Sequence, residues 1–411
     1  MKPSQPSTAD LSSGPPLRWL LTLAALSALA TLSTNLLLPA LPGMAPALGV
    51  DAGALTAAVL GPFLAVFAGA QLIVGPLADR IGRRPVVLGG LALFVAGSCL
   101  GAAAGALPLL LAGRALQAVG VAAASVLARA AARDRFEGAP LAALLGRIMV
   151  VMAAAPGFSP LLGGLVEAAA GWRALFGLLA AAGLALALAY ARVVGETLPA
   201  ERRRHLPAAA LVRAYASFAG DARFMHPALA TAAILGGLFA FFGTAPLVLA
   251  QRFGFSSLQV GLFFAASVFV VFAAGRAAPG WARRWGALAV LRSGAALALA
   301  GGLTMAAGGA EGAAGAAAFA ASACVFLFGM GLVSPTGTAA ALTPFAAQAG
   351  QASALLGFLQ MAAAAALATA ATLLPVARQD ALAGILTVAG AAALACCSSR
   401  AARPVAHPGG H

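Results

Sequence analysis

The sequence predicts an all-α integral membrane protein whose twelve membrane-spanning helices form two halves of six. Of the 411 residues, 62% are hydrophobic and 9% are charged, and the mean hydropathy is +0.96. Soluble domains average about 45–50% apolar and about 25% charged residues. The apolar residues fall into runs of about 20 residues, which is the length that crosses a bilayer. A polar segment at 195–226 separates six of these runs from the other six.

The candidate spans contain Gly and Pro, which membrane helices tolerate better than soluble helices. They lie at about 17–40, 53–74, 85–104, 107–130, 141–168, 172–194, 227–250, 258–279, 286–308, 313–338, 350–375 and 381–399. The first run has no small-residue cleavage pattern, so we expect it to be retained as helix 1. The expected organisation is a disordered tail at 1–16, a half at 17–194, a linker at 195–226, a half at 227–399 and a tail at 400–411.

The arginines predict the orientation. With the N-terminus in the cytoplasm, 21 of the 25 basic residues fall on the cytoplasmic side. Three (Arg173, Arg252 and Arg378) fall outside, and Arg114 lies inside a span. This asymmetry follows the positive-inside rule and predicts that both termini are cytoplasmic. It also explains the net charge of +14 without nucleic acid as a partner.

A weak internal repeat supports two related halves. Arg80-Ile81-Gly82 recurs 204 positions later as Arg284-Trp285-Gly286, again after an even-numbered span on the cytoplasmic side. The second copy is degenerate, because Arg283 replaces the acid of the first. Parallel six-helix repeats with a substrate site between them are one arrangement that transporters use.

The segment GPLADRIGRR at 75–84 concentrates charge between two apolar runs. The residues that form its pattern are Gly75, Leu77, Ala78, Asp79, Arg80, Gly82, Arg83 and Arg84. At these positions the segment resembles the loop between helices 2 and 3 of major facilitator superfamily transporters, whose pattern is G-x-L-A-D-R-x-G-R-R.

Further strings narrow the resemblance. They are STNLLLPALPGMA (33–45), GRALQAVG (113–120), ARAAARD (128–134), APGFSPLLGG (155–164), GWRALF (171–176), ETLP (196–199) and AGQASALLGFLQ (349–360). Together they resemble the Bcr/CflA group of drug:proton antiporters over about residues 20–375. The resemblance implies the major facilitator fold and multidrug efflux from the inner membrane of a bacterial cell. We expect a monomer.

The 75–84 loop has two interpretations. In the first it is a conformational latch: Asp79 meets a helix N-terminus or arginines of a neighbouring helix end, and the contact breaks when the transporter changes state. In the second the loop only sets topology. We favour the latch, because topology alone does not require Asp79.

Arg114 lies about 10 Å into its predicted helix, too deep for easy snorkelling. A charge there costs about 2.5–3.5 kcal/mol on insertion scales and usually faces a cavity or a partner. The resemblance links Arg114 to proton transfer, whereas the alternative is an arginine satisfied by backbone carbonyls. Gln117 lies one turn on and shares its face.

Asn35 departs from the family pattern, which has an acid at this position. None of the eleven acidic residues falls in the middle of a predicted span, and Asn cannot titrate. Proton coupling then depends on Arg114 and water, or on Glu167 from a span end, or is absent. We also hypothesise a neutral, zwitterionic or anionic substrate. The alternative is that Asn35 only bonds between helices.

In the fifth span, Pro156, Pro160, Gly163 and Gly164 resemble the family's antiporter motif, with Ser159 in place of a glycine. Proline bends a helix and glycine allows close approach, so we interpret the segment as a hinge, against ordinary small-residue packing. Gln360 is the best candidate for a cavity residue in helix 11, since polar residues in spans usually face a cavity or another helix. The aromatic and Met residues Phe239, Phe241, Phe242, Phe358 and Met361 suit a drug pocket but equally suit packing.

The leading function is therefore a secondary efflux transporter for small organic compounds, by proton antiport or without proton coupling. A transport-inactive sensor would need a sizeable soluble domain, which the sequence does not predict. An enzyme would need a catalytic motif, and neither a metallo-helix nor a nucleophile elbow occurs. The cysteines lack metal-ligand spacing, and no phosphate-binding loop occurs, so we expect no cofactor or metal.

Overall fold

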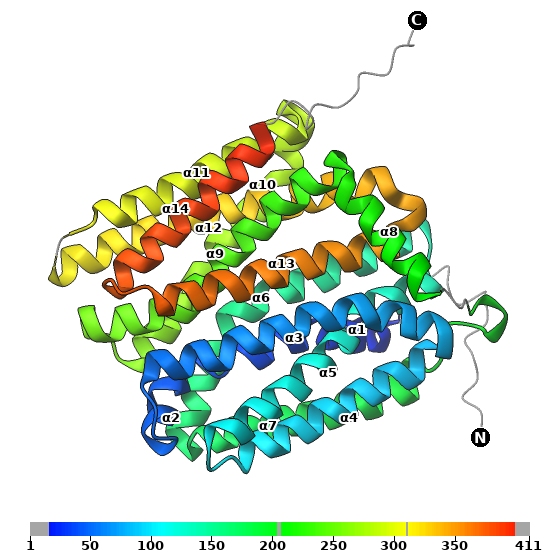
Figure 1. Ribbon diagram of the computed structural model, residues 1–411, viewed down its shortest axis with the longest axis horizontal. Coiled ribbons are helices and arrows are strands. Elements are labelled where there is room, and N and C mark those ends of the chain that lie inside the picture. Colours follow the sequence, from blue (N-terminus) through cyan, green and yellow to red (C-terminus); the bar gives the residue numbers. More distant parts are fainter. Residues whose placement is uncertain (1–15, 204–206, 310, 399–411) are drawn as a thin grey trace, which may run out of the picture.

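The computed structural model describes residues 16–203, 207–309 and 311–398. The two expected tails, apart from Pro16, lie outside the described residues. The described chain is helical and folds into one bundle of long helices that run roughly side by side (Figure 1).

The first half contains six of the predicted spans. Its helices are α1 (Leu17–Asn35), η2 (Leu38–Ala40), α2 (Leu41–Ala47), α3 (Ala52–Ile81), α4 (Arg83–Ala102), α5 (Leu107–Arg135), α6 (Gly138–Ala170) and α7 (Trp172–Ala189), followed by a π-helical turn, η3 (Tyr190–Val194). Helix α1 ends at Asn35 rather than near residue 40. Pro39 lacks the N–H that would continue it, and a short 3₁₀ turn follows.

The second half follows a short connection that contains a helix of its own. Its elements are η4 (Ala200–Arg202), α8 (Ala208–Gly220), α9 (Ala222–Phe253), α10 (Ser257–Trp285), α11 (Ala287–Ala307), α12 (Gly312–Leu342), η5 (Thr343–Gln348), α13 (Ala349–Leu373) and α14 (Arg378–Ser398). Helix α9 begins at Ala222, inside the segment expected as linker. Asp221 caps it by accepting from Arg223 N.

Within the described residues, eleven helical stretches are long and apolar enough to span a membrane. Helix α6 adds a shorter apolar stretch, Phe158–Ala170. These correspond to the twelve predicted spans, so the predicted fold class is confirmed.

Helix packing gives each half the same arrangement. In the first half α3, α5, α1 and α6 lie in that order as a layer, and in the second half α10, α12, α9 and α13 do so. The halves meet mainly through α3 with α13 and through α6 with α10. Figure 1 shows α3 beside α13 along much of their length. Consequently α1 and α5 lie between the two joining pairs and face the layer that contains α9 and α12.

The repeat seen in the sequence has a structural counterpart. Gly82 ends α3 and precedes α4 with φ of 103°, and Gly286 ends α10 and precedes α11 with φ of 89°. Residues with a side chain rarely adopt such φ values, so both sharp connections favour glycine. The predicted correspondence of these two glycines is thus visible in the backbone.

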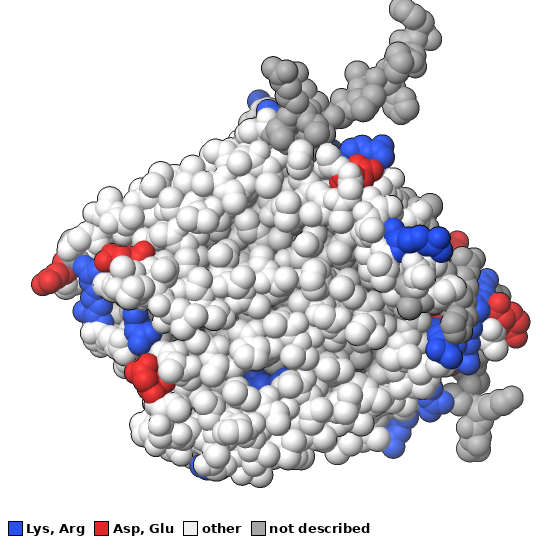
Figure 2. Space-filling view, viewed as in Figure 1, with Lys and Arg blue, Asp and Glu red and all other residues white. Residues whose placement is uncertain are grey.

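Charged side chains gather at the two ends of the bundle, and the face between them is mostly uncharged (Figure 2). The three arginines expected outside make contacts near one end. Arg378 pairs with Asp51, Arg252 donates to Gln379, and Arg173 donates to the carbonyl of Ala104. We call this the Asp51 end, and the opposite one the Gly82 end.

Candidate functional site

A buried arginine lies at the centre of the candidate site. Arg114 is on α5, and 1% of it is exposed. Its guanidinium carbon lies 3.9 Å from the centroid of the Phe63 ring on α3, a cation–π contact. Helices α1 and α3 flank α5 in the facing layer, and Arg114 contacts both of them.

Polar contacts hold one end of this guanidinium. Arg114 Nη1 donates to the carbonyl of Ser33 at 3.1 Å, to Ser33 Oγ at 3.3 Å and to Gln117 Oε1 at 2.8 Å. Gln117 Nε2 donates to Ser98 Oγ at 2.8 Å, and Ser98 Oγ donates to the carbonyl of Phe94 at 2.7 Å. The hydrogen-bond network around Arg114 and Gln117 therefore links α1, α5 and α4.

Close helix packing makes this network compact. A Cβ on Gly97 of α4 would meet the Gly113 carbonyl of α5, and a Cβ on Gly113 would lie 3.1 Å from Gly101 N. Glycines at these positions let the two backbones touch, so that Ser98 comes within reach of Gln117.

Other polar atoms at the centre are unsatisfied. Among the described residues, Arg114 Nε and Nη2 have no hydrogen-bond partner, and neither does Oδ1 of Asn35. Asn35 is at the C-terminal end of α1, and 2% of it is exposed. The interpretation of Asn35 as a group that hydrogen-bonds between helices is not supported at Oδ1, which accepts no hydrogen bond from a described residue. Unsatisfied buried groups of this kind are uncommon and call for an explanation.

The halves touch at three heights along α3, twice through α13 and once through the start of α14. At the Gly82 end, Gln71 Nε2 donates to the carbonyl of Gly357 at 3.3 Å. A Cβ on Gly61 would meet Thr369 Oγ1, and nearer the Asp51 end a Cβ on Gly53 would meet the guanidinium of Arg378. The structure thus has the halves closed along this seam. The sequence analysis did not single out Gln71, although a polar residue inside a span was the available signal.

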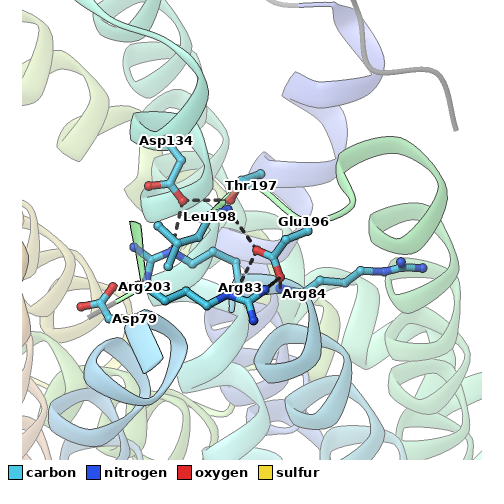
Figure 3. A network of polar contacts seen from close by, with 8 residues as sticks. All are labelled: Asp79, Arg83, Arg84, Asp134, Glu196, Thr197, Leu198 and Arg203. Atoms are coloured by element: carbon cyan, nitrogen blue, oxygen red, sulfur yellow. Dashed lines mark hydrogen bonds and ion pairs between the residues drawn. The ribbon is translucent and has the colours of Figure 1, made fainter. Parts of the chain in front are cut away.

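The 75–84 loop forms a chain of ion pairs (Figure 3). Asp79 Oδ1 lies 2.7 Å from Arg83 Nη1, and Arg83 Nε lies 3.1 Å from Asp134 Oδ2 at the end of α5. Thr197 Oγ1 also donates to Asp134 Oδ2, at 2.8 Å. A Cβ added at Gly75 would have no atom within 4 Å. Arg80 and Arg84 are exposed. These bonds join helices of the first half and its connection, rather than one half to the other.

Glu196 occupies the N-terminus of α4. Its Oε1 accepts from Arg83 N at 2.9 Å and from Leu198 N at 3.0 Å, and its Oε2 accepts from Arg84 N at 3.3 Å. Arg203 Nη2 lies 3.7 Å from Oε2 (Figure 3). An acid is favourable at a helix N-terminus, because it satisfies free N–H groups and interacts with the helix dipole. Asp79 pairs with Arg83 at the start of α4, an arginine of a neighbouring helix end, which is one of the two kinds of partner that the latch interpretation named.

The α6 glycines differ in their surroundings. A Cβ on Gly163 would collide with the carbonyl of Leu36, whereas a Cβ on Gly164 would meet only Pro39 Cβ at 4.0 Å. Pro160 is buried in the same helix. The side chain of Pro156 lies outside the described residues. The absence of a side chain at Gly163 therefore lets α6 pack closely against the backbone at Leu36, directly after the end of α1.

The remaining candidates lie away from the Arg114 bonds. Gln360 is half-buried on α13 in the second half and takes no part in them. A Cβ on Gly43 of α2 would lie 2.7 Å from Glu167 Oε1, which places this acid near the Asp51 end. Phe241 and Phe242 of α9 are buried against Phe264 of α10, with ring centroids 5.6 Å apart in each pair. This packing agrees with the simpler interpretation of these two aromatics.

The fold and this site define a class of protein. In the described part of the chain, eleven membrane-length helical stretches and the shorter apolar stretch of α6 form two equivalent halves, and a polar network is buried between apolar spans in the layer where the halves face each other. This is the architecture of a membrane transporter. Residues 23–397 match the Major Facilitator Superfamily, and the chain belongs to that superfamily.

Similar proteins include two that are named for drug resistance. Multidrug resistance protein D of Escherichia coli K12 is 30% identical over 92% of this chain and 94% of its own. A chloramphenicol resistance protein of Pseudomonas aeruginosa is 34% identical over 69% of this chain and 67% of its own. Among solved structures, the human organic anion transporter MFSD10 aligns with a TM-score of 0.64 at 21% identity, over 93% of this chain and 99% of that chain. The superfamily resemblance is confirmed, and the protein is a multi-pass membrane transporter rather than an enzyme.

Proposed function

We propose that the protein is a secondary transporter that exports small organic compounds across the bacterial inner membrane in exchange for protons. Relatives named for multidrug and chloramphenicol resistance support export of such compounds. The buried network of Arg114 carries the proposal, because a charge at membrane depth is costly and marks a substrate or ion pathway. The proposed orientation places both termini and the Gly82 end in the cytoplasm, and the proposed unit is a monomer.

Export would proceed by alternating access. The α3–α13 seam is closed in the structure, so a substrate reaches Arg114 after the halves rock apart. In this scheme the Asp79–Arg83–Asp134 chain keeps the Gly82 end of the first half rigid while the halves move. The latch is thus proposed as a brace within one half.

A second candidate function is favoured by Asn35. Helices α1, α9 and α12 contain no Asp or Glu within their bounds, and α5 contains Asp134 in its last turn. Without a carboxylate beside Arg114 to take up and release a proton, the protein would export or equilibrate a neutral, zwitterionic or anionic compound without proton coupling.

Transport by reconstituted protein tests both candidates. The parent and Asn35→Asp would each be reconstituted into liposomes that contain a pH-sensitive dye. Transport of ethidium or chloramphenicol and the internal pH would be followed with and without an imposed proton gradient. Gradient-dependent export by the parent with matching proton movement supports antiport. Export without proton movement, together with a gain of proton movement in Asn35→Asp, supports the uncoupled function. Strong export of ethidium that depends on Asn35 contradicts the expected substrate charge, and no export of any compound contradicts the proposed function.

A further inference from the structure

Within the residues that the structure describes, the Arg114 guanidinium has hydrogen-bond partners on one side and none on the other, and we call the unpartnered side its open edge. Its two protein partners, Ser33 and Gln117, bind only Nη1. Nε and Nη2 are unpartnered among the described residues, although only 1% of the residue is exposed. The protein therefore fixes the orientation of the group and leaves two of its nitrogens unused.

Nε and Nη2 share one in-plane edge of a guanidinium, on the side away from Nη1. Their two parallel N–H groups match the two oxygens of a carboxylate, and this bidentate pair is among the stronger hydrogen-bonded contacts in proteins. The guanidinium carbon lies 3.9 Å from the centroid of the Phe63 ring, a cation–π contact that leaves the hydrogen-bonding capacity of Nε and Nη2 unused. The open edge thus has the geometry of a carboxylate-binding fork.

No described protein carboxylate pairs with this fork. The acids in the described ion pairs all lie at or beyond helix ends: Asp51, Asp79, Asp134, Glu196 and Asp221. Asn35, the polar residue two positions after Ser33, is a neutral amide. A buried positive charge without a partner is costly, so an anion that completes the pair gains affinity.

We propose that the open Nε–Nη2 edge of Arg114 binds the carboxylate of a transported organic acid. This inference rests on the proposed function and names its substrate class. The helix order supports it, since α5 lies in the layer between the two seams, facing α9 and α12. The substrate carboxylate would be the negatively charged partner of Arg114, and Gln117 and Ser33 would keep the guanidinium in the orientation that presents Nε and Nη2 to it.

Matched acids and esters test the proposal on the parent protein alone. Binding of nalidixic acid, 2-naphthoic acid and N-acetylphenylalanine would be measured by isothermal calorimetry in detergent at pH 7, each beside its methyl ester. We expect at least one acid to bind about tenfold or more tightly than its ester. Equal binding of acid and ester in every pair, or tighter binding of the esters, would overturn the proposal.

Two arginine variants separate a binding role from a structural one. Arg114→Lys keeps the charge but cannot present two parallel N–H groups, so the preference for the acid over its ester should fall about tenfold while ester binding stays unchanged. Arg173→Lys is the matched control, because Arg173 also lies over an aromatic ring, 4.2 Å from the Trp172 centroid, but at the Asp51 end. Its acid preference should equal that of the parent. A preference that survives Arg114→Lys unchanged contradicts the assignment.

Export of chloramphenicol by the same protein reconstituted in liposomes separates the two proposals. If chloramphenicol is exported while no acid is preferred over its ester, the organic-acid inference fails and the transporter function stands. If neither chloramphenicol nor any of the six compounds of the panel is transported or bound, both proposals fail together.

Discussion

Glu196 caps helix α4 by accepting a hydrogen bond from Arg83 N at 2.9 Å, across 113 positions of sequence. The same carboxylate accepts from Arg84 N, so two free N–H groups of the first turn of α4 are satisfied by one side chain. The connection after α7 is thereby fixed to the loop between α3 and α4.

Removing this cap should destabilise the first half. Glu196→Ala leaves the N–H groups of Arg83 and Arg84 without their acceptor, and loss of a helix cap costs about 0.5–2 kcal/mol. Unfolding in detergent micelles, followed by circular dichroism, would measure the change. Glu201→Ala is the control, since Glu201 is exposed in the short helix η4 of the same connection. Equal stability of the two variants would refute the capping role.

Asp134→Asn should loosen α4 from α5. The Arg83 side chain is 11% exposed and would keep Asp79 but lose its charged partner on α5. Loss of one hydrogen-bonded partner of a buried charged group costs about 1–3 kcal/mol. Thermal unfolding measures the loss. Glu137→Gln, at an exposed acid three residues on, should leave the midpoint unchanged; a similar fall in both variants would point to a general charge effect.

Adjacent glycines in α6 should respond oppositely to the same change. Gly163→Ala forces α6 away from the Leu36 carbonyl and should cost about 1–3 kcal/mol, typical of overpacking. Gly164→Ala has room and should be neutral or slightly stabilising, because alanine favours helix by about 1 kcal/mol. Melting temperatures of the two variants provide the comparison. Tolerance of Gly163→Ala would mean that this close approach does not constrain the fold.

The seam between the halves should open when Gly357 gains a side chain. Gly357→Ala displaces the Gln71 side chain and removes its bond to the Gly357 carbonyl, worth about 1 kcal/mol. Such a change shifts an equilibrium about fivefold. A cysteine introduced at buried Ala68 on α3, in a background lacking the native cysteines, should then be alkylated several-fold faster. Gly350→Ala in the same helix meets no atom and should leave the rate unchanged.

The stability of the fold should fall at alkaline pH through Tyr215. Its hydroxyl donates to the Leu72 carbonyl at 3.0 Å, and burial, followed by the charge of Asp79, raises the pKa of this phenol from 10.0 to about 12. The folded state therefore keeps the proton longer than the unfolded chain does. Its contribution is complete below pH 10 and is lost as the pH rises toward 12. Denaturant titrations at pH 9 to 12 should show a shallower decline for Tyr215→Phe than for the parent, and identical slopes would contradict this assignment.

Periodicity and motif spacing predicted most of the fold, because apolar runs of membrane length leave few alternatives in a bilayer. The end of α1 was misplaced, because the apolar run continues through Pro39 and hydropathy does not register the missing N–H. The helix in the connection, α8, was not predicted, since its polar surroundings resembled a loop.

The candidate site was predicted in part. Arg114 and Gln117 were expected to share a face, because they are three positions apart on one helix, and they are bonded. Phe63, Ser33 and Ser98 were not identified, because apolar and small residues occur throughout the spans and only their packing distinguishes them. Gln360 was expected to face a cavity from helix 11; it lies half-buried on α13 and takes no part in the Arg114 bonds, and its cavity role stays a prediction.

The sequence by itself determined the number of spans, the two related halves and the superfamily, because these depend on local hydropathy and on motifs that are contiguous in the chain. Tertiary structure decided which acid meets which base. Asp79 pairs with Arg83, Arg83 with Asp134 and Glu196 with the first turn of α4. It also showed that Arg114 has one bonded side and one open edge. The contacts of Arg83 with Asp134 and of Glu196 with Arg83 N join residues 51 and 113 positions apart, so they depend on how the helices pack, which local sequence patterns do not specify.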